Sequence, residues 1–281
     1  YEFRLPMDFA DVMPDEKEWI INSVEYWRNR NILSRTRKAV LDFLGVDIGT
    51  LQKCGVATEI NPGGLMSGIP DYGWVIDIGL DAIIEQIQAR KKELDRGDPD
   101  ESQQWYFLEG AELSLKGIVT LAKRYADQAR EMAASESDAA RKKELEEMAD
   151  VCDQVPAKPA RSFREAIQSA WFCILGAWFQ TPNIAVSAPA RFAQYTYPLY
   201  KKDKDAGRIT EAEAIELIQY YFIRIQSLGQ VLPPQGFKYS QSRVALQLSI
   251  GGLTPEGNDA TNEVDWLLLE AKRQLMIPEP L

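Results

Sequence analysis

The stretch that most constrains the fold runs from Arg243 to Leu275, because it reads as a strand, a tight turn and a helix in succession. Residues 244–250 show apolar alternation with β-branched ends, a pattern typical of a buried strand. Residues 251–258 are rich in Gly, Pro and Asn, which set special backbone angles. Asp259 or Thr261 is the expected cap of the helix. On pattern alone this is a generic βα unit, and such junctions are where α/β enzymes place working groups. The apolar face of its helix carries Val264, Leu267, Leu268, Ala271 and Leu275.

The composition is that of an ordinary globular chain that lacks histidine. Its 281 residues are 45% hydrophobic and 26% charged, a typical balance for such proteins. The net charge of −10 argues against nucleic acid as a partner. With no histidine and only Cys54, Cys152 and Cys173, we expect no metal site, no disulfide framework and no Ser-His-Asp site. The sequence has no run of 18 apolar residues and no secretory leader, so we expect a cytoplasmic protein without membrane contact.

Capping signals predict several further helices. Pro14 is expected to begin one helix, and Trp27 is interpreted as a core residue near its end. Ser162 caps a helix that is apolar nearly all round, which predicts an interior position. Thr210 and Glu213 have the spacing of a capping box.

The middle of the chain, residues 91–150, is charge-dense and helical in character. Another helix is expected to begin after Asp71, where Pro and Asp punctuate the sequence. The buried side of the charge-dense helix is expected to carry Leu108, Leu113, Leu115, Ile118, Val119 and Leu121.

Three blocks of the sequence, taken in order, resemble glycyl-radical enzymes, the family of pyruvate formate-lyase. PDYGWVIDIGLDAI, from Pro70, is similar to that family's P-D-Y-x-x-V-L-x-x-G-L-x-G-I. ARFAQYTYPLYKKDKDAGRIT, from Ala190, resembles G-R-x-D-Q-Y-L-Y-P-Y-Y-x-x-D-x-x-x-G-x-I-T, with Ala190 and Ala193 in place of the usual Gly and Asp. GGLTPEGNDATNE, from Gly251, resembles G-G-x-x-x-D-G-x-D-A-T-N-E. The second block keeps Arg191, Gln194, Tyr195, Tyr197, Pro198, Asp203 and Gly207.

The resemblance implies a helix-rich α/β fold, namely the outer helices and first strands of a ten-stranded barrel. In the family, the two radical-bearing loops meet at the centre of that barrel, and both are expected beyond the D-A-T-N-E block. We therefore expect residues 1–281 to be the N-terminal portion of a pyruvate formate-lyase-like domain. On this expectation the chain holds no catalytic residue of its own and is inactive alone.

The resemblance also places four residues of this chain on the family's substrate pocket. Ser67 stands where the formate-lyase carries Arg and the diol dehydratases carry His. None of the four has a formal charge, so the pocket favours a substrate with an apolar body. A turn role for Ser67 and plain core packing for the other three stay open. The four residues are Ser67, Ala185, Val186 and Tyr239.

A radical relay is the mechanism that the resemblance implies. A glycyl radical, installed by an iron–sulfur S-adenosylmethionine activating enzyme, oxidises a cysteine to a thiyl radical, which abstracts hydrogen from the substrate. The charge-free pocket favours addition of a hydrocarbon to fumarate, as in benzylsuccinate and alkylsuccinate synthases. An arylacetate decarboxylase or a diol dehydratase or lyase is the alternative. A non-catalytic helical scaffold or binding subunit is the alternative of another class.

The partners that follow from the resemblance are the substrate and other proteins. We expect a small apolar or aryl substrate, with fumarate in the synthase branch, and the activating enzyme. A homodimer and small accessory subunits are also expected.

Overall fold

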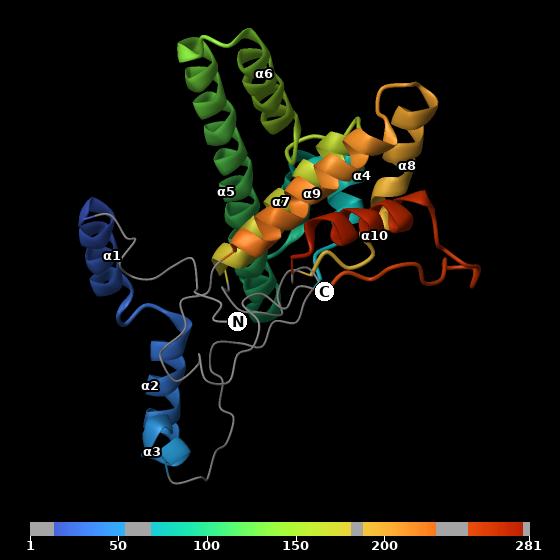
Figure 1. Cartoon of the computed structure of the whole chain (residues 1–281). Helices are drawn as coiled ribbons and strands as arrows, with labels where there is room; N and C mark the ends of the chain where they lie inside the picture. The colour runs from blue at the N-terminus through green and yellow to red at the C-terminus, as the bar shows by residue number, and fades with distance from the viewer. Residues whose placement is uncertain (1–13, 54–68, 181–187, 229–246, 278–281) are drawn as a thin grey trace. The chain divides into compact units, whose positions relative to one another are not determined.

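The computed structural model describes residues 14–53, 69–180, 188–228 and 247–277. Contacts divide the chain into two compact units, one of residues 1–67 with 229–241 and the other of residues 68–228 with 242–281. Both units are helical in their described parts (Figure 1). No helix among the described ranges is long and apolar enough to cross a membrane.

The first unit contains α1 (Pro14–Trp27), α2 (Ile32–Leu44) and α3 (Ile48–Lys53). Pro14 begins α1 as predicted. The side chain of Asn31 caps α2 by accepting a hydrogen bond from the Ser34 amide at 2.8 Å. The interpretation of Trp27 as a core residue is wrong, since this side chain is 55% exposed. Its indole lies edge-on against the neighbouring ring of Tyr26 rather than inside a packed layer.

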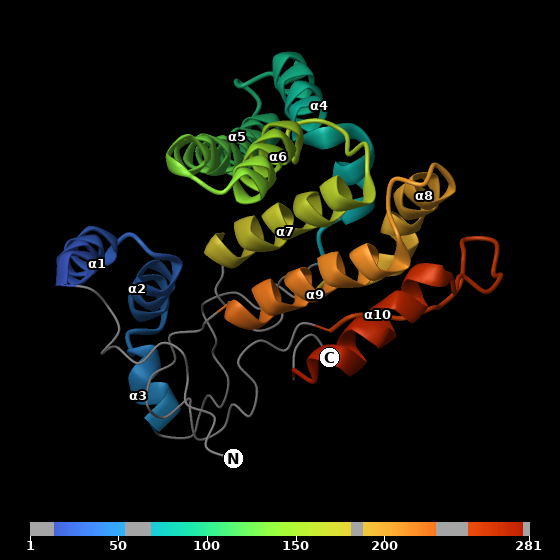
Figure 2. The same cartoon turned by 45° about the horizontal axis from the view of Figure 1, so that its top comes forward.

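The second unit is a layered assembly of seven helices in its described residues. These are α4 (Tyr72–Glu93), α5 (Pro99–Ser135), α6 (Ala139–Gln154), α7 (Phe163–Gln180), α8 (Phe192–Asp205), α9 (Glu211–Ser227) and α10 (Glu263–Leu275). Helix α7 lies in the middle of this unit and contacts α4, α5, α6, α8 and α9 (Figure 2). Helix α10 packs on α9 and α8 at the far side from α5 and α6.

The prediction that the apolar helix after Ser162 lies in the interior is confirmed. Phe163, Phe172 and Ile174 of α7 are fully buried, as expected of a helix without a polar face. The Ser162 hydroxyl accepts a hydrogen bond from the Glu165 amide at 3.3 Å. The capping box of α9 also forms, with Thr210 and Glu213 bonding reciprocally.

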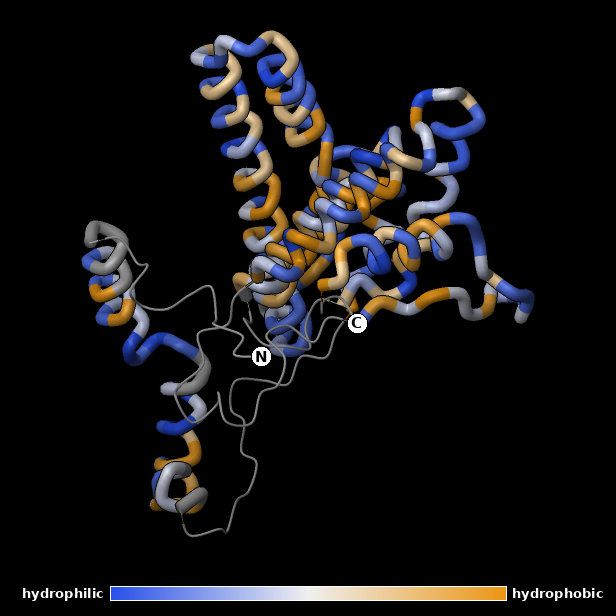
Figure 3. The backbone as a smooth tube through the Cα atoms, viewed as in Figure 1, coloured by the Kyte–Doolittle hydropathy of each residue, from blue (hydrophilic) through white to orange (hydrophobic). Residues whose placement is uncertain are grey.

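Helices α5 and α6 form an antiparallel hairpin that projects from the rest of the unit (Figure 1). Hydrophilic and hydrophobic positions alternate along both helices (Figure 3). Leu113, predicted to be buried, is 62% exposed, while Leu115, Ile118, Val119 and Leu121 pack partly against the core. The hairpin closes through small side chains instead, because alanines at helical spacing let α6 approach closely. The buried alanines of this stripe in α5 are Ala122, Ala126, Ala129 and Ala133.

The predicted strand at 244–250 appears, in its described part, only as an isolated parallel bridge between Leu248 and Ala190. A second isolated bridge, antiparallel, joins Leu253 to Asp259. Ile250 is 43% exposed, so the expectation of a buried strand is not met at this end. A strand becomes buried when neighbours pair and pack on both of its sides. Here one bridge supports it among the residues described. The described part is otherwise helical, which agrees with the helix-rich α/β fold predicted.

Helix α4 contains a break that another part of the chain fills. Gly79 has φ 77° and ψ 161° inside the helix, values that only glycine adopts readily. The loop between α6 and α7 supplies the missing backbone partners: the amides of Leu80 and Asp81 donate to the carbonyls of Pro156 and Ala157 at 2.8 and 2.9 Å. The Gly-Leu-Asp sequence of the first family-like block therefore has a structural reason here.

We expect Gly79→Ala to lower the free energy of unfolding by about 3 kcal/mol, from the strained positive φ and the overpacking together. A Cβ at this position would lie 2.5 Å from the Ala157 oxygen and 2.6 Å from the Lys158 Cα. The measurement is urea unfolding followed by circular dichroism. Gly110→Ala is the matched control, because its Cβ meets nothing within 4 Å and alanine favours a helix. Equal destabilisation by both variants would contradict this account.

A second prediction concerns Glu112, a buried carboxylate between α4 and α5. It accepts hydrogen bonds from Lys116 at 2.5 Å, Gln88 at 2.8 Å and Lys91 at 2.9 Å, which lower its pKa from 4.5 to about 2. A depressed folded pKa contributes stability above the unfolded pKa, and this contribution is lost as pH falls through the folded pKa. Between pH 4.5 and 2, stability should fall more steeply in the native protein than in Glu112→Gln. Parallel curves in thermal melts over this window would refute the assignment.

Candidate functional site

The four residues predicted to line a substrate pocket all lie outside the described residues. They are Ser67, Ala185, Val186 and Tyr239. Their pocket role therefore stays a prediction. The structure does describe the chain on the C-terminal side of each of them, and these neighbouring segments are where the site can be built from geometry.

Three chain segments meet beside the N-terminal end of α8. Residues 188–191 lead into α8, residues 69–72 lead into α4, and residues 247–251 lead into the Gly-Gly turn. The amide of Ser249 donates to the carbonyl of Ala190 at 2.8 Å, next to the bridge that Ala190 makes with Leu248. These contacts bring segments about sixty residues apart in the sequence side by side.

Ala190 occupies an unusual backbone conformation at this junction. Its φ is 50°, in the left-handed region that favours glycine. The resembling family block has Gly at this position, so the departure seen in the sequence is a departure at a strained residue. The strain is sustained by the bonds on either side of it.

Gln194 and Tyr195, adjacent residues of α8, anchor two of these segments. The Gln194 side-chain amide donates to the carbonyl of Gly251 at 2.8 Å. The Tyr195 hydroxyl donates to the carbonyl of Pro189 at 3.0 Å. The ring of Tyr195 also stacks on the ring of Tyr72, with centroids 5.4 Å apart. One turn of α8 thus contacts all three segments.

A cluster of buried aromatic rings lies beneath this junction. Phe192 lies 5.6 Å from Tyr195 and 5.0 Å from Tyr221, measured between ring centroids. Burial raises the pKa of the Tyr72, Tyr195 and Tyr221 hydroxyls. The proximity of Tyr221 raises the pKa of Tyr72 and Tyr195 further. These hydroxyls therefore stay protonated and neutral across the physiological pH range. The cluster provides no general base and acts as an uncharged, dry support.

The described cysteines are also protonated. Burial raises the pKa of the Cys173 thiol to about 12, and burial with the nearby Asp153 raises that of Cys152 to about 11. Cys173 is buried in α7, which is the environment of an inert, packed thiol. In the described ranges, no group of three or more His, Cys, Asp or Glu side chains could hold a metal ion.

Asp265 fixes the turn that connects the Gly-Gly segment to α10. Its carboxylate is buried and accepts from the Gly251 amide at 2.9 Å and from the Asn262 amide at 2.8 Å. The Ala260 amide donates to the carbonyl of Gly252 at 3.0 Å, which closes the turn. Asp265 thereby satisfies the backbone on both sides of the turn.

The helix cap predicted at Asp259 or Thr261 is wrong by one to three residues. Asn262 caps α10, and Asp265 completes its capping box. Asp259 instead accepts from the amide and hydroxyl of Thr261 at 2.9 and 2.7 Å, which makes a local turn before the helix. The predicted apolar face is confirmed, since Val264, Leu267, Leu268 and Ala271 are buried.

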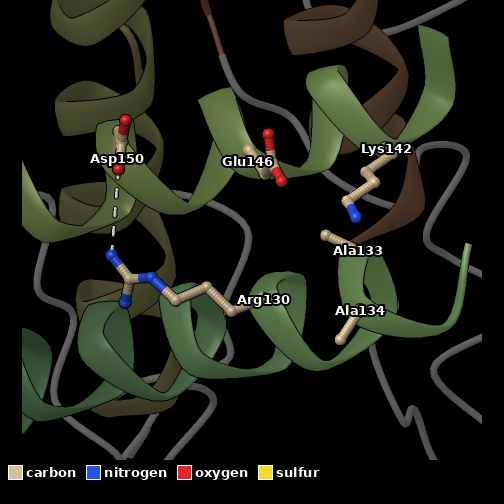
Figure 4. Close-up of a pocket in the computed structure, with 6 residues that line it drawn as sticks. All are labelled: Arg130, Ala133, Ala134, Lys142, Glu146 and Asp150. Atoms are coloured by element: carbon tan, nitrogen blue, oxygen red, sulfur yellow. Dashed lines mark ion pairs between the residues drawn. The ribbon is translucent and has the colours of Figure 1, made fainter. Parts of the chain in front are cut away.

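Two surface hollows among the described residues lie away from this junction. One of about 350 Å³ lies between α5 and α6 and is lined by Arg130, Ala133, Ala134, Lys142, Glu146 and Asp150 (Figure 4). Arg130 pairs there with Asp150 at 3.8 Å and closely with Asp153. Another, of about 690 Å³, lies beside Phe107 and Arg90. Both are open and rich in charged or polar groups.

Analysis of the sequence alone did not single out the supporting roles of Asp265 and Tyr72. Asp265 lies three residues after Asn262, and an acidic residue at that spacing is the signal of a capping box. Tyr72, Gln194 and Tyr195 fall inside the family-like blocks. Nothing in their spacing, however, indicates that α4 and α8 come together.

Comparisons with known proteins agree with the three sequence blocks. The Pyruvate formate lyase-like family model matches residues 5–281. Isethionate sulfite-lyase of Nitratidesulfovibrio vulgaris is 36% identical over 215 residues, which are 75% of this chain and 26% of that protein. The 4-hydroxyphenylacetate decarboxylase glycyl radical subunit of Clostridioides difficile is 31% identical, over 75% of this chain and 24% of that protein.

A solved structure shows the same fold. It concerns 1,2-propanediol dehydration in Roseburia inulinivorans, and it superposes with a TM-score of 0.83 at 30% sequence identity. The match covers 95% of this chain and 33% of that one. The chain thus spans between a quarter and a third of the length of these relatives.

We expect Asp265→Asn to lower the free energy of unfolding by about 2 kcal/mol, because one of the two buried backbone amides then faces an NH2 group. Glu263→Gln is the matched control on the same turn of helix. Its carboxylate is half exposed and pairs with Lys204 at 2.8 Å, so its loss should cost less than about 1 kcal/mol. Urea unfolding of both variants provides the comparison. Asp265→Asn behaving like its control would show that the turn does not depend on this carboxylate.

Proposed function

Because the chain belongs to the pyruvate formate-lyase-like family of glycyl-radical enzymes, we propose that it is part of a radical lyase that removes a small group from an organic substrate. The main support for this proposal is that the family model matches nearly the whole chain. The names of the related proteins describe loss of sulfite, of a carboxyl group and of water. Bond cleavage that begins with hydrogen abstraction is common to such reactions.

The radical residues themselves are proposed to lie in parts of the enzyme other than this chain. We propose that residues 1–281 form the N-terminal portion of the catalytic domain. A glycyl radical, installed by an iron–sulfur S-adenosylmethionine activating enzyme, would supply the thiyl radical that abstracts hydrogen. A homodimer, accessory subunits and a cytoplasmic location belong to the same proposal.

The contribution of this chain's own residues is to shape and dry the site. Ser67, Ala185, Val186 and Tyr239 are proposed to line the pocket, and none of them carries a charge. The support described beneath the N-terminal end of α8 is also uncharged and free of ionised thiols. Such surroundings exclude water, as radical intermediates require. They favour a substrate with an aryl or alkyl body.

Among radical lyases, decarboxylation of an arylacetate satisfies both lines of support. One relative is a 4-hydroxyphenylacetate decarboxylase subunit, and an aryl ring suits a charge-free lining. The second candidate is addition of a hydrocarbon to fumarate, which the sequence alone favoured. The apolar lining supports it, but none of the relatives named above is such a synthase. Fumarate and an arylacetate both carry carboxylates, so either substrate would require a cationic partner outside the four lining residues.

The enzyme that contains this chain is expected to gain a doublet electron paramagnetic resonance signal when its activating enzyme treats it anaerobically with S-adenosylmethionine and a reductant. The activated enzyme is then incubated separately with 4-hydroxyphenylacetate, 1,2-propanediol, isethionate, and toluene plus fumarate. Release of carbon dioxide from the arylacetate is the expected result. A toluene–fumarate adduct would favour the synthase instead.

Two controls define the limits of this test. Enzyme that was never activated should convert none of the four probes. If activation produces no radical signal although the activating enzyme cleaves S-adenosylmethionine, the lyase proposal is wrong. A non-catalytic helical subunit then becomes the better interpretation.

A further inference from the structure

Two consecutive side chains of α8 connect three segments that are remote in the sequence. Tyr195 contacts the segment before α8 through Pro189 and the segment before α4 through Tyr72. Gln194 contacts the Gly-Gly segment through the carbonyl of Gly251. Helix α8 can hold the three segments in fixed positions because Phe192 and Tyr200, which are fully buried, anchor it in the core.

The bond from Tyr195 to Pro189 uses the one backbone hydrogen-bonding group that Pro189 offers. Pro189 has no amide hydrogen, so its carbonyl is its only backbone hydrogen-bonding group. The Tyr195 hydroxyl reaches that oxygen at 3.0 Å. The raised pKa of Tyr195 keeps the hydroxyl protonated and able to donate. The next residue, Ala190, holds a positive φ, and such a conformation persists only where neighbouring bonds determine it.

The stack of Tyr195 on Tyr72 fixes the start of α4 against the same point. The rings lie 5.4 Å apart with an angle of 28° between their planes, an arrangement that adds to the free energy of simple burial. A Cβ at Gly73 would lie 3.5 Å from the Tyr195 Cβ, so the backbone of α4 approaches α8 closely there. The N-cap Asp71, which accepts from Trp74 at 3.0 Å, completes this end of α4.

Each held segment lies close along the chain to a proposed lining residue. Pro189 follows Val186 by three residues, Tyr72 follows Ser67 by five, and Leu248 follows Tyr239 by nine.

We propose that Gln194 and Tyr195 are positioning residues, which set the relative placement of the three segments leading from the substrate-lining residues; this inference rests on the function proposed above. A substrate with an apolar body offers few directional bonds, so the shape of the wall must orient it. A wall whose segments shift apart makes fewer contacts with such a substrate and binds it more weakly. A fixed link between the segments is therefore part of how such a site works.

The first test is hydrogen–deuterium exchange in the enzyme that contains this chain, and it requires no turnover. Tyr195→Phe removes the bond to Pro189 and keeps the ring, so exchange of the peptide over residues 188–192 should rise about fivefold, the loss of one ordinary hydrogen bond. Tyr195→Leu also removes the stack and should raise exchange over residues 69–76 as well. Gln194→Leu should act on residues 248–253 instead.

Tyr200→Phe is the matched control for exchange. Tyr200 is a buried tyrosine of the same helix, and its hydroxyl has no hydrogen-bond partner within the described ranges. It should leave all three peptides unchanged. Residues 122–133 of α5 provide an internal reference that no variant should alter. Unchanged exchange in Tyr195→Phe and Gln194→Leu, or an equal rise in every peptide, would overturn the inference even if the enzyme proves to be a radical lyase.

The second test is kinetic and uses whichever of the four probes the activated enzyme converts. Tyr195→Phe should raise KM about fivefold, with kcat per glycyl radical within twofold of the native enzyme. Radical yield and the thermal midpoint should stay near native values. Tyr200→Phe should show native KM. A native KM in Tyr195→Phe, or the same rise in Tyr200→Phe, would contradict a positioning role. Absence of turnover in the native enzyme would count against the proposed function and leave the exchange result to decide the positioning role.

Discussion

The second unit depends on a single buried carboxylate that holds the start of its central helix. The Phe163 amide at the N-terminus of α7 donates to Asp203 Oδ2 at 2.7 Å. The other oxygen of Asp203 accepts from Arg208 at 2.7 and 2.9 Å. The first amides of a helix have no partner within it, and α7 is buried, so water cannot replace Asp203. These bonds join the start of α7 to the end of α8 and to the turn between α8 and α9. They thereby support the helix that carries Gln194 and Tyr195.

The same constraint explains two other features of the unit. At Gly79 the break in α4 leaves backbone groups that the loop from Pro156 to Ala160 satisfies. At the Gly-Gly turn, Asp265 satisfies the amides of Gly251 and Asn262. In each case an irregular backbone is supported by groups from another part of the chain. The family-like blocks therefore coincide with places where helices begin or break.

The sequence predicted well what depends on neighbours along the chain. Helix starts at Pro14, Asp71, Ser162 and Thr210 follow from local capping chemistry, and the family-like blocks identified a fold that the comparisons support. Burial was less predictable, because it depends on which other parts of the chain pack against a helix. Leu113 has apolar neighbours in the sequence, as a core leucine does. It nevertheless lies on a side of α5 that no described helix covers.

The candidate site shows the same difference between features that the sequence predicts and features that depend on packing. Its predicted lining residues follow from the resemblance and still await a test, whereas its support became visible only in three dimensions. No spacing in the sequence relates Tyr72 to Tyr195, which are 123 positions apart. The stack between them exists because α4 and α8 both pack against α7. Contacts of this kind arise from tertiary packing, and no periodic pattern in a single sequence predicts them.

The chemistry proposed for this family places a special demand on such a support. A phenolic hydroxyl can give up its hydrogen to a radical, so tyrosines near a radical site are a liability unless the hydrogen is engaged elsewhere. Tyr195 directs its hydrogen to the Pro189 carbonyl, and burial keeps the group neutral and away from bases that would ease its oxidation. The bond that holds the segment before α8 in place therefore also engages the hydroxyl hydrogen of Tyr195. A phenylalanine would remove that liability but would also release the segment, which gives a physical reason for a tyrosine at this position.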